Sequence, residues 1–391
     1  MDTLIASHRV ITGEFDDEGR PRPARELTIA LTDGRVVAVS EGVAPGARLL
    51  DGVIVPGFVD THTHGAARAA FVDPDPVAVQ RAIDLHRRHG STTIFASTVS
   101  AAVPEVHAQL DRLRRFVESG ELAGVHLEGP FISAARKGAH TESLLIAPDA
   151  DVLEPLLADP VVRMITLAPE LPGGMEAVRA CVRHGVAAAF GHSDADAATT
   201  AASVDAGVTV TTHLFNAMRG INHREPGPVP VLLTDPRVMV ELICDGVHLA
   251  PETVRLAIAA AGYARVGLVT DAMAATGEAD GDYELGGLAV EVRGGVARLA
   301  TDDGTPGAIA GSTLTMDRAV RFLVQTVGLE LAAAAAMASS VPARWHGLDE
   351  VGELLPGRRA DLCLLDDTTT LTGVMRRGTW IVAPPGMEES A

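Results

Sequence analysis

The sequence predicts a (β/α)8 barrel of the TIM type, together with a small β-sandwich domain formed from both ends of the chain. Three observations carry this prediction. Short apolar runs alternate with helical stretches through the middle of the chain, and polar side chains follow most of those runs where each run ends. Alternating apolar and polar residues, typical of half-exposed strands, are concentrated near the two ends.

Length, charge and cysteine content exclude several classes of protein. The 391 residues suffice for one barrel with an appendage. A formal net charge of −19 argues against a nucleic-acid surface. No apolar run approaches the ~20 residues of a membrane helix, and the N-terminus lacks the basic and apolar segments of a secretory signal. Three scattered cysteines form no CxxC motif, so we expect a cytoplasmic protein.

The small domain is expected from strands at both ends of the chain. Asp33-Gly34 separates the alternating runs 27–31 and 35–39, which predicts a β-hairpin. Further strand-like runs occur only near the C-terminus, at 360–365 and 379–382. We therefore expect residues 1–52 and 350–391 to form one β-sandwich domain around a catalytic barrel at 53–349.

The barrel is predicted from eight apolar runs, most of them separated by helical stretches such as 76–89, 194–206 and 251–261. The runs lie near 53–61, 91–98, 123–128, 163–168, 186–191, 208–213, 238–244 and 265–271. Residues 276–311 depart from the repeat, and Arg293-Gly294-Gly295-Val296 between alternating runs predicts an inserted β-hairpin. In such barrels the carboxyl ends of the strands form the active-site face.

Candidate metal ligands follow four of these runs. His62 and His64 are two residues apart on an extended segment, so both imidazoles point to the same face. Glu128 ends the third run, and His192 and His213 end the fifth and sixth. Because neighbouring strands lie about 4.8 Å apart, these side chains suit one or two divalent ions.

Two further residues near the strand ends have different expected roles. Asp271 follows the eighth run, where a carboxylate beside activated water suits a general base; an additional metal ligand is the alternative. His126 lies one layer deeper than Glu128 on the same strand face, so we expect a packed, hydrogen-bonded histidine there.

The motifs resemble the N-acetylglucosamine-6-phosphate deacetylase branch of the amidohydrolase superfamily, in order from about residue 53 to the end of the chain. The resemblance rests on Val125-His-Leu-Glu-Gly-Pro-Phe131, Gly191-His-Ser-Asp194, Thr212-His-Leu-Phe-Asn-Ala-Met218, His223-Arg-Glu-Pro-Gly227, Cys244-Asp-Gly-Val-His248 and Val269-Thr-Asp-Ala-Met273. It implies a metal-dependent hydrolase barrel that releases acetate from N-acetyl-D-glucosamine 6-phosphate, in amino-sugar catabolism and cell-wall sugar recycling.

The resemblance also implies a role for each matching residue. Glu128, His192 and His213 hold the catalytic ion, and His62 and His64 hold a second ion in some members. Zinc is the expected metal, with ferrous iron as the alternative. The other roles are a catalytic base at Asp271, carbonyl and sugar contacts at His140, and substrate contacts at Asn216, Ala217, Arg224 and His248. A homodimer is implied, with Arg224 and His248 donated to the neighbouring active site.

Several alternatives stay open on the sequence. The sugar could be N-acetylgalactosamine 6-phosphate, because no residue is identified that distinguishes the two epimers. Cyclic amidases of the superfamily bridge two metals with a carboxylated lysine, but the single lysine, Lys137, lies in a loop beyond Glu128. A deaminase leaves Glu128 and the Arg224 turn without a role. Arg68 stands where the family has a glycine-rich loop, so it is expected to crowd the pocket edge or add a positive group.

Overall fold

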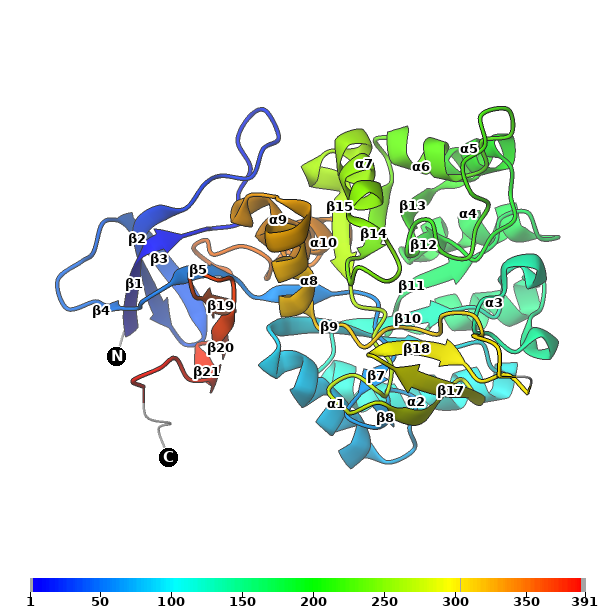
Figure 1. Ribbon diagram of the computed structural model, residues 1–391, viewed down its shortest axis with the longest axis horizontal. Helices are drawn as coiled ribbons and strands as arrows, with labels where there is room; N and C mark the ends of the chain where they lie inside the picture. The colour runs from blue at the N-terminus through cyan, green and yellow to red at the C-terminus, as the bar shows by residue number, and fades with distance from the viewer. Residues whose placement is uncertain (1–2, 303, 388–391) are drawn as a thin grey trace.

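Eight parallel strands form the central sheet of the computed structural model, which describes residues 3–302 and 304–387. In order around the sheet they are β6 (Phe58–Asp60), β9 (Ser91–Thr98), β10 (Gly124–Glu128), β11 (Val162–Leu167), β12 (Ala187–Phe190), β13 (Val208–Thr211), β14 (Met239–Ile243) and β15 (Val266–Val269). Figure 1 shows the helices around this sheet. The predicted TIM-type barrel is confirmed.

The gap between β15 and β6, the two ends of this order, is bridged by individual hydrogen bonds. The backbone N–H of Asp271 donates to the carbonyl oxygen of His62 over 2.8 Å. The Thr270 hydroxyl donates to the Asp60 carboxylate over 2.6 Å. Asp60 is fully buried, and burial raises the pKa of its carboxyl to about 7. The barrel is therefore closed by one backbone and one side-chain hydrogen bond, close in sequence to the predicted site residues His62 and Asp271.

The outer helices begin at residues that the sequence marks as helix starts. Asp75 caps the first helix by accepting the backbone N–H of Val77, and Asp196 caps a later one through Thr199. In the described part of the chain, no helix is long and apolar enough to cross a membrane. The helices are α1 (Pro76–Arg88), α2 (Val103–Glu118), α3 (Ala150–Leu157), α4 (Gly174–His184), α5 (Ala197–Ala206), α6 (Val229–Thr234), α7 (Pro251–Ala261), α8 (Met316–Phe322), α9 (Leu331–Ala338) and α10 (Ser340–Trp345).

Both ends of the chain contribute to a second sheet, at the left of Figure 1. Its strands are β1 (Thr3–Val10), β2 (Arg25–Thr32), β3 (Arg35–Glu41), β4 (Arg48–Leu49), β5 (Val53–Pro56), β19 (Leu362–Leu365), β20 (Leu371–Arg376) and β21 (Thr379–Val382). The predicted hairpin joins β2 to β3, and Asp33 and Gly34 both have positive φ, as a type I′ turn requires. Residues from β2 and β20 share one apolar core, which gives the sheet its sandwich-like packing.

The apolar run at 53–61 is divided between the two sheets. Its first part, β5, pairs with β1 and β19, and only β6 belongs to the barrel. Gly57 lies between them, and a Cβ atom there would stand 2.3 Å from the Thr92 hydroxyl. The run therefore connects the small domain to the barrel rather than forming one long barrel strand.

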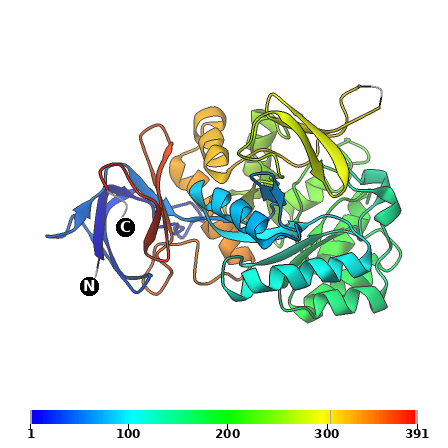
Figure 2. The same ribbon diagram turned by 90° about the horizontal axis from the view of Figure 1, so that it is seen from below.

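The insertion after the eighth barrel strand is a three-stranded antiparallel sheet, one strand more than the predicted hairpin. It comprises β16 (Gly281–Leu285), β17 (Leu288–Arg293) and β18 (Val296–Leu299). Figure 2 shows it in yellow as a layer against the barrel. Its apolar face packs on Val99, Ala139 and Met273. This packing brings Leu285 and Ile309 to the edge of the site described next.

Candidate active site

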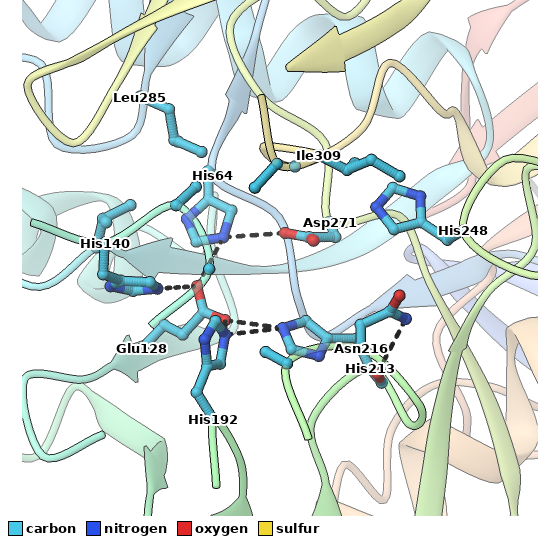
Figure 3. Close-up of a pocket in the computed structure, with 16 residues that line it drawn as sticks. His64, Glu128, His140, His192, His213, Asn216, His248, Asp271, Leu285 and Ile309 are labelled. Carbon is cyan, nitrogen blue, oxygen red and sulfur yellow. Dashed lines mark hydrogen bonds and ion pairs between the residues drawn. The ribbon is translucent and has the colours of Figure 1, made fainter. Parts of the chain in front are cut away.

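One cavity contains most of the predicted site residues. Nine of the eleven line it directly: His64, Glu128, His140, His192, His213, Asn216, Ala217, His248 and Asp271 (Figure 3). His62 is fully buried beside His64 and behind the cavity wall. Arg224 is the exception and is described below.

Glu128, the last residue of β10, lies between two groups of histidines. Its Oε1 atom is 3.1 Å from His192 Nε2 and 3.2 Å from His213 Nε2. Its Oε2 atom is 3.1 Å from His64 Nε2. Burial raises the pKa of this carboxyl, but the charge on His62 and hydrogen bonds from other imidazoles outweigh burial and hold the pKa well below its usual range. One ionised carboxylate therefore faces both histidine groups.

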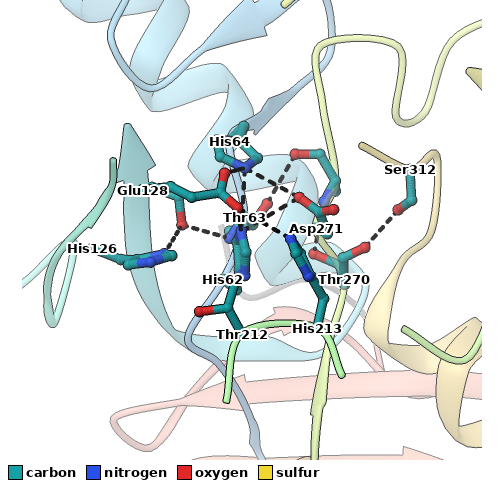
Figure 4. Close-up of polar contacts among 12 residues, drawn as sticks. His62, Thr63, His64, His126, Glu128, Thr212, His213, Thr270, Asp271 and Ser312 are labelled. Atoms are coloured by element: carbon teal, nitrogen blue, oxygen red, sulfur yellow. Dashed lines mark hydrogen bonds and ion pairs between the residues drawn. The ribbon is translucent and has the colours of Figure 1, made fainter. Parts of the chain in front are cut away.

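His62 and His64 converge as their alternation along the extended segment predicts. Their Nε2 atoms are 3.3 Å apart, and both face Asp271 Oδ1, at 3.5 Å from His62 and 3.1 Å from His64 (Figure 4). Burial lowers the pKa of His64, but the Asp271 and Glu128 carboxylates outweigh it and raise that pKa to about 9. The pKa of His62 is raised well above its usual value by the same two carboxylates, against burial.

The donor set fits one or two divalent ions. Two pairs of buried imidazoles meet through their Nε2 atoms, His62 with His64 and His192 with His213, the latter at 3.1 Å. Neutral imidazole nitrogens at this distance repel each other unless a proton or cation lies between them. Oxygen and nitrogen donors from carboxylates and imidazoles are the ligands that zinc and related ions take. The residues present therefore fit a metal centre.

Asp271 follows β15 in a left-handed conformation, with a φ of +49°. Its backbone carbonyl accepts the N–H of Ser312 over 2.7 Å, which ties this turn to the segment that follows the insertion. Burial raises the pKa of the Asp271 carboxyl, but the charges of His62 and His64 outweigh burial and lower the pKa to about 2. The carboxylate is therefore ionised at neutral pH and able to accept a proton.

His140 faces the same space from a loop after β10. Its Nδ1 lies 2.8 Å from the Ser100 hydroxyl and accepts the Ser100 backbone N–H over 3.3 Å. Its Nε2 lies 3.6 Å from Glu128. Burial lowers the pKa of His140. A neutral ring whose Nδ1 accepts a hydrogen bond carries its proton on Nε2, the atom that faces the cavity.

The remaining wall is formed by residues that follow β13 and β14. His213, Phe215 and Ala217 all have positive φ, a rare and strained arrangement for residues other than glycine. The Asn216 side chain donates to the carbonyl oxygen of His213 over 3.1 Å, which stabilises this loop. His248 Nδ1 lies 2.7 Å from the Asp245 carboxylate.

Two expectations about pocket residues differ from the structure. His248 lines the cavity of its own chain, and its side chain is only 6% exposed, so the expected donation of His248 to a neighbouring site is corrected. After β14 ends at Ile243, the Asp245 carboxylate accepts the backbone N–H of His248 and contacts its ring, which holds the His248 side chain in this position. Arg68 lines a neighbouring hollow, where it stacks on Tyr283 and pairs with Glu278. It therefore does not crowd the cavity.

Two other predicted residues lie outside the cavity. Arg224 lies on an exposed loop, where its backbone N–H donates to Asn222 Oδ1 over 3.1 Å, and it does not line the cavity of its own chain. His126 is packed below the site as predicted, with hydrogen bonds to Ser97 at 2.9 Å and Thr166 at 2.7 Å.

The structure also adds a residue that the sequence reasoning missed. Glu241 lies in the middle of β14, is fully buried, and places Oε2 3.3 Å from His62 Nδ1. The available signal was a charged residue inside the apolar run Met239–Ile243, since glutamate is almost never fully buried without a partner.

Comparisons with known proteins agree with this architecture. The profile of the family described as "Amidohydrolase family" matches residues 53–381. An N-acetylgalactosamine-6-phosphate deacetylase from Escherichia coli O157:H7 is 37% identical, covering 94% of this chain and 96% of the relative. An N-acetylglucosamine-6-phosphate deacetylase from Lysinibacillus sphaericus is 32% identical, covering 97% of both chains.

A solved structure supports the same assignment at the level of the whole fold. It is a variant of the N-acetyl-D-glucosamine-6-phosphate deacetylase from Mycobacterium smegmatis, in complex with N-acetyl-D-glucosamine-6-phosphate. The two chains are 43% identical and superpose with a TM-score of 0.92, covering 98% of this chain and 100% of the other.

Proposed function

The chain belongs to the amidohydrolase family, and from this premise we propose that it hydrolyses the N-acetyl group of N-acetyl-D-glucosamine 6-phosphate, releasing acetate and D-glucosamine 6-phosphate. The observation that carries the proposal is that Glu128, two histidine pairs and Asp271 meet at one cavity, which all of them line except His62 just behind its wall. The names of the relatives supply the substrate class.

Glu128, His192 and His213 would hold the catalytic divalent ion, and His62 and His64 would hold a second ion; Glu128 contacts histidines of both groups. Zinc is the metal this ligand set favours, and ferrous iron is the alternative. When bound, the metal supplies Lewis-acid activation of the amide carbonyl and of the attacking water.

Asp271 performs both proton transfers in the proposed reaction. Its ionised carboxylate accepts a proton from the attacking water as the new carbon–oxygen bond forms. It then donates that proton to the amide nitrogen as the carbon–nitrogen bond breaks, which gives the neutral amine and acetic acid; the acid loses its remaining hydroxyl proton to solvent and becomes acetate. The buried position of Asp271 beside His64 keeps the carboxylate in one orientation for both transfers.

His140 stabilises the negative charge that develops on the carbonyl oxygen. Ser100 holds its Nδ1, so the Nε2–H donates into the cavity. Removing one such donor typically costs catalysis about 10²- to 10³-fold.

The phosphate is bound by groups that are neutral or positive in an otherwise acidic protein. Asn216, the backbone of Ala217 and His248 line the cavity beside the histidines. We propose a homodimer in which Arg224 reaches the phosphate of the neighbouring subunit, because its loop is exposed and it does not line the cavity of its own chain. A guanidinium can hold a phosphate through two parallel hydrogen bonds.

The galactosamine epimer is a second candidate substrate, favoured by the 37% identity to an N-acetylgalactosamine-6-phosphate deacetylase. Steady-state acetate release with both 6-phosphate sugars tests the proposal. We expect a higher kcat/KM for the glucosamine substrate. The reverse order would assign the galactosamine reaction instead, and ammonia without acetate would assign a deaminase.

A further inference from the structure

Glu241 is a buried carboxylate that contacts both histidine groups of the site. Its Oε1 accepts a hydrogen bond from the Thr61 hydroxyl over 3.3 Å. Its Oε2 lies 3.3 Å from His62 Nδ1 and accepts the backbone N–H of His213 over 3.4 Å. The side chain is fully buried and lies behind the metal ligands, on the side away from the cavity.

A carboxylate in this position needs a partner. Removing a charge from water is unfavourable unless an opposite charge and hydrogen bonds compensate. Among residues 3–302 and 304–387, no arginine or lysine pairs with Glu241, and the imidazole of His62 is the one basic side chain that contacts its carboxyl group. The Glu241 carboxyl group is instead held by three hydrogen-bond partners, namely the Thr61 hydroxyl, His62 Nδ1 and the His213 backbone N–H.

We propose that Glu241 is a positioning residue that prepares His62 to bind the ion at the His-x-His pair; this rests on the proposed metal-dependent function. Glu241 accepts the Nδ1–H of His62 and so holds the ring in the tautomer whose Nε2 lone pair faces His64 and Glu128. Carboxylates that accept the second ring N–H of a metal-bound histidine fix its orientation and raise its basicity.

Among the proposed histidine ligands, His62 differs in having a carboxylate at its Nδ1 atom, so loss of Glu241 should affect the His-x-His site most. His64 Nδ1 and His213 Nδ1 have no hydrogen-bond partner in the described chain, whereas His192 Nδ1 is held by the carbonyl of Arg136 over 3.1 Å. Glu241 touches His213 only through the backbone N–H, which does not fix a ring tautomer. Figure 4 shows His62 between His64 and His213, at the meeting point of the two groups.

Glu241→Gln tests the proposal, because it keeps the shape of the side chain and removes its charge. Metal-free protein is titrated with Zn²⁺ against a chromophoric chelator, and the sites are assigned by anomalous diffraction. We expect the affinity at the His-x-His site to fall about 10- to 100-fold, with less than threefold change at the Glu128–His192–His213 site. Thr166→Val is the matched control, since it removes a buried hydroxyl that bonds His126 and Thr212. It should bind both ions normally.

Two further measurements separate positioning from a general structural role. If Glu241 acts through His62, Glu241→Gln made in a His62→Asn background should cost no additional Zn²⁺ affinity. In the zinc-loaded wild-type protein, ¹⁵N-histidine spectra should show an exchange-protected Nδ1–H on His62. This measurement uses only the wild-type protein, so it does not depend on whether a variant folds. Four results would each overturn the proposal. They are two ions bound to Glu241→Gln with wild-type affinities, only one ion bound to the wild type, additive losses of affinity in the double variant, and an Nε2–H tautomer at His62. Normal zinc binding without acetate release would refute the proposed function and leave this inference standing.

Discussion

Replacing Asp271 by asparagine should abolish most of the catalysis while leaving the fold and the metal in place. Asparagine has the same shape but cannot accept the proton of the attacking water or return it to the nitrogen. The φ of +49° at this position favours asparagine over alanine, because asparagine is enriched in left-handed backbone. The backbone bonds to His62 and Ser312 should therefore survive the substitution.

The magnitude follows from the role of the carboxylate. Asp271 Oδ1 lies 3.1 Å from His64 Nε2, and no second aspartate lines the described cavity to replace it. Loss of a positioned acid–base group costs about 10²- to 10⁴-fold, and Asp271 serves two transfers, so we expect a fall in kcat of ~10³- to 10⁴-fold, or about 4 to 5.5 kcal/mol.

Acetate release under saturating substrate measures kcat, and elemental analysis of the same sample measures bound metal. Asp271→Ala is the comparison variant: it should be equally inactive but less stable, because alanine in left-handed backbone costs roughly 1–2 kcal/mol. Turnover of Asp271→Asn within tenfold of wild type, with metal bound, would refute the role of Asp271.

Three other predictions follow from the same geometry. Because the pKa of His64 is raised to about 9, its ring carries an extra proton in the metal-free protein at neutral pH. Metal binding should therefore release protons and weaken as pH falls, which calorimetry in buffers of different ionisation enthalpy measures; binding without proton release would contradict this prediction. His140→Gln should lower kcat about 10²-fold with bound metal unchanged, and an unaltered kcat would exclude His140 as the carbonyl donor. Arg224→Ala should raise KM roughly 10- to 100-fold. If Arg224 acts across a dimer, mixing this variant with Asp271→Asn chains should restore about a quarter of wild-type activity, because only one of the two sites in each mixed dimer is complete. No recovery on mixing would argue against donation between subunits.

The sequence predicted which residues meet at the cavity because the signal is local. Each barrel strand is an apolar run, and the three predicted ligands Glu128, His192 and His213 lie at or within two residues of a strand end, so they meet once the strands close into a barrel. The alternation of His62 and His64 likewise predicts that their Nε2 atoms meet, and they are 3.3 Å apart. Local periodicity and the strand-end rule suffice for these residues.

Other features depend on contacts between distant segments. The run 53–61 is divided between the two sheets because β5 pairs with β19, which lies more than 300 positions later in the chain. No local sequence pattern reveals this pairing. The inward position of His248 depends on the turn at Asp245, and a resemblance to dimeric relatives suggested the opposite. The role of Glu241 depends on closure of the barrel, which brings its side chain on β14 within 3.3 Å of His62, a residue 179 positions earlier in the chain.

The proposed metal-dependent deacetylation is tested most directly by following one reaction with metal-free protein, before and after zinc is restored. Acetate and D-glucosamine 6-phosphate are quantified together from N-acetyl-D-glucosamine 6-phosphate. We expect equal amounts of the two products from the reconstituted protein and at least ~10²-fold less from the metal-free protein. Equal rates with and without metal, or substrate consumed without acetate, would contradict it.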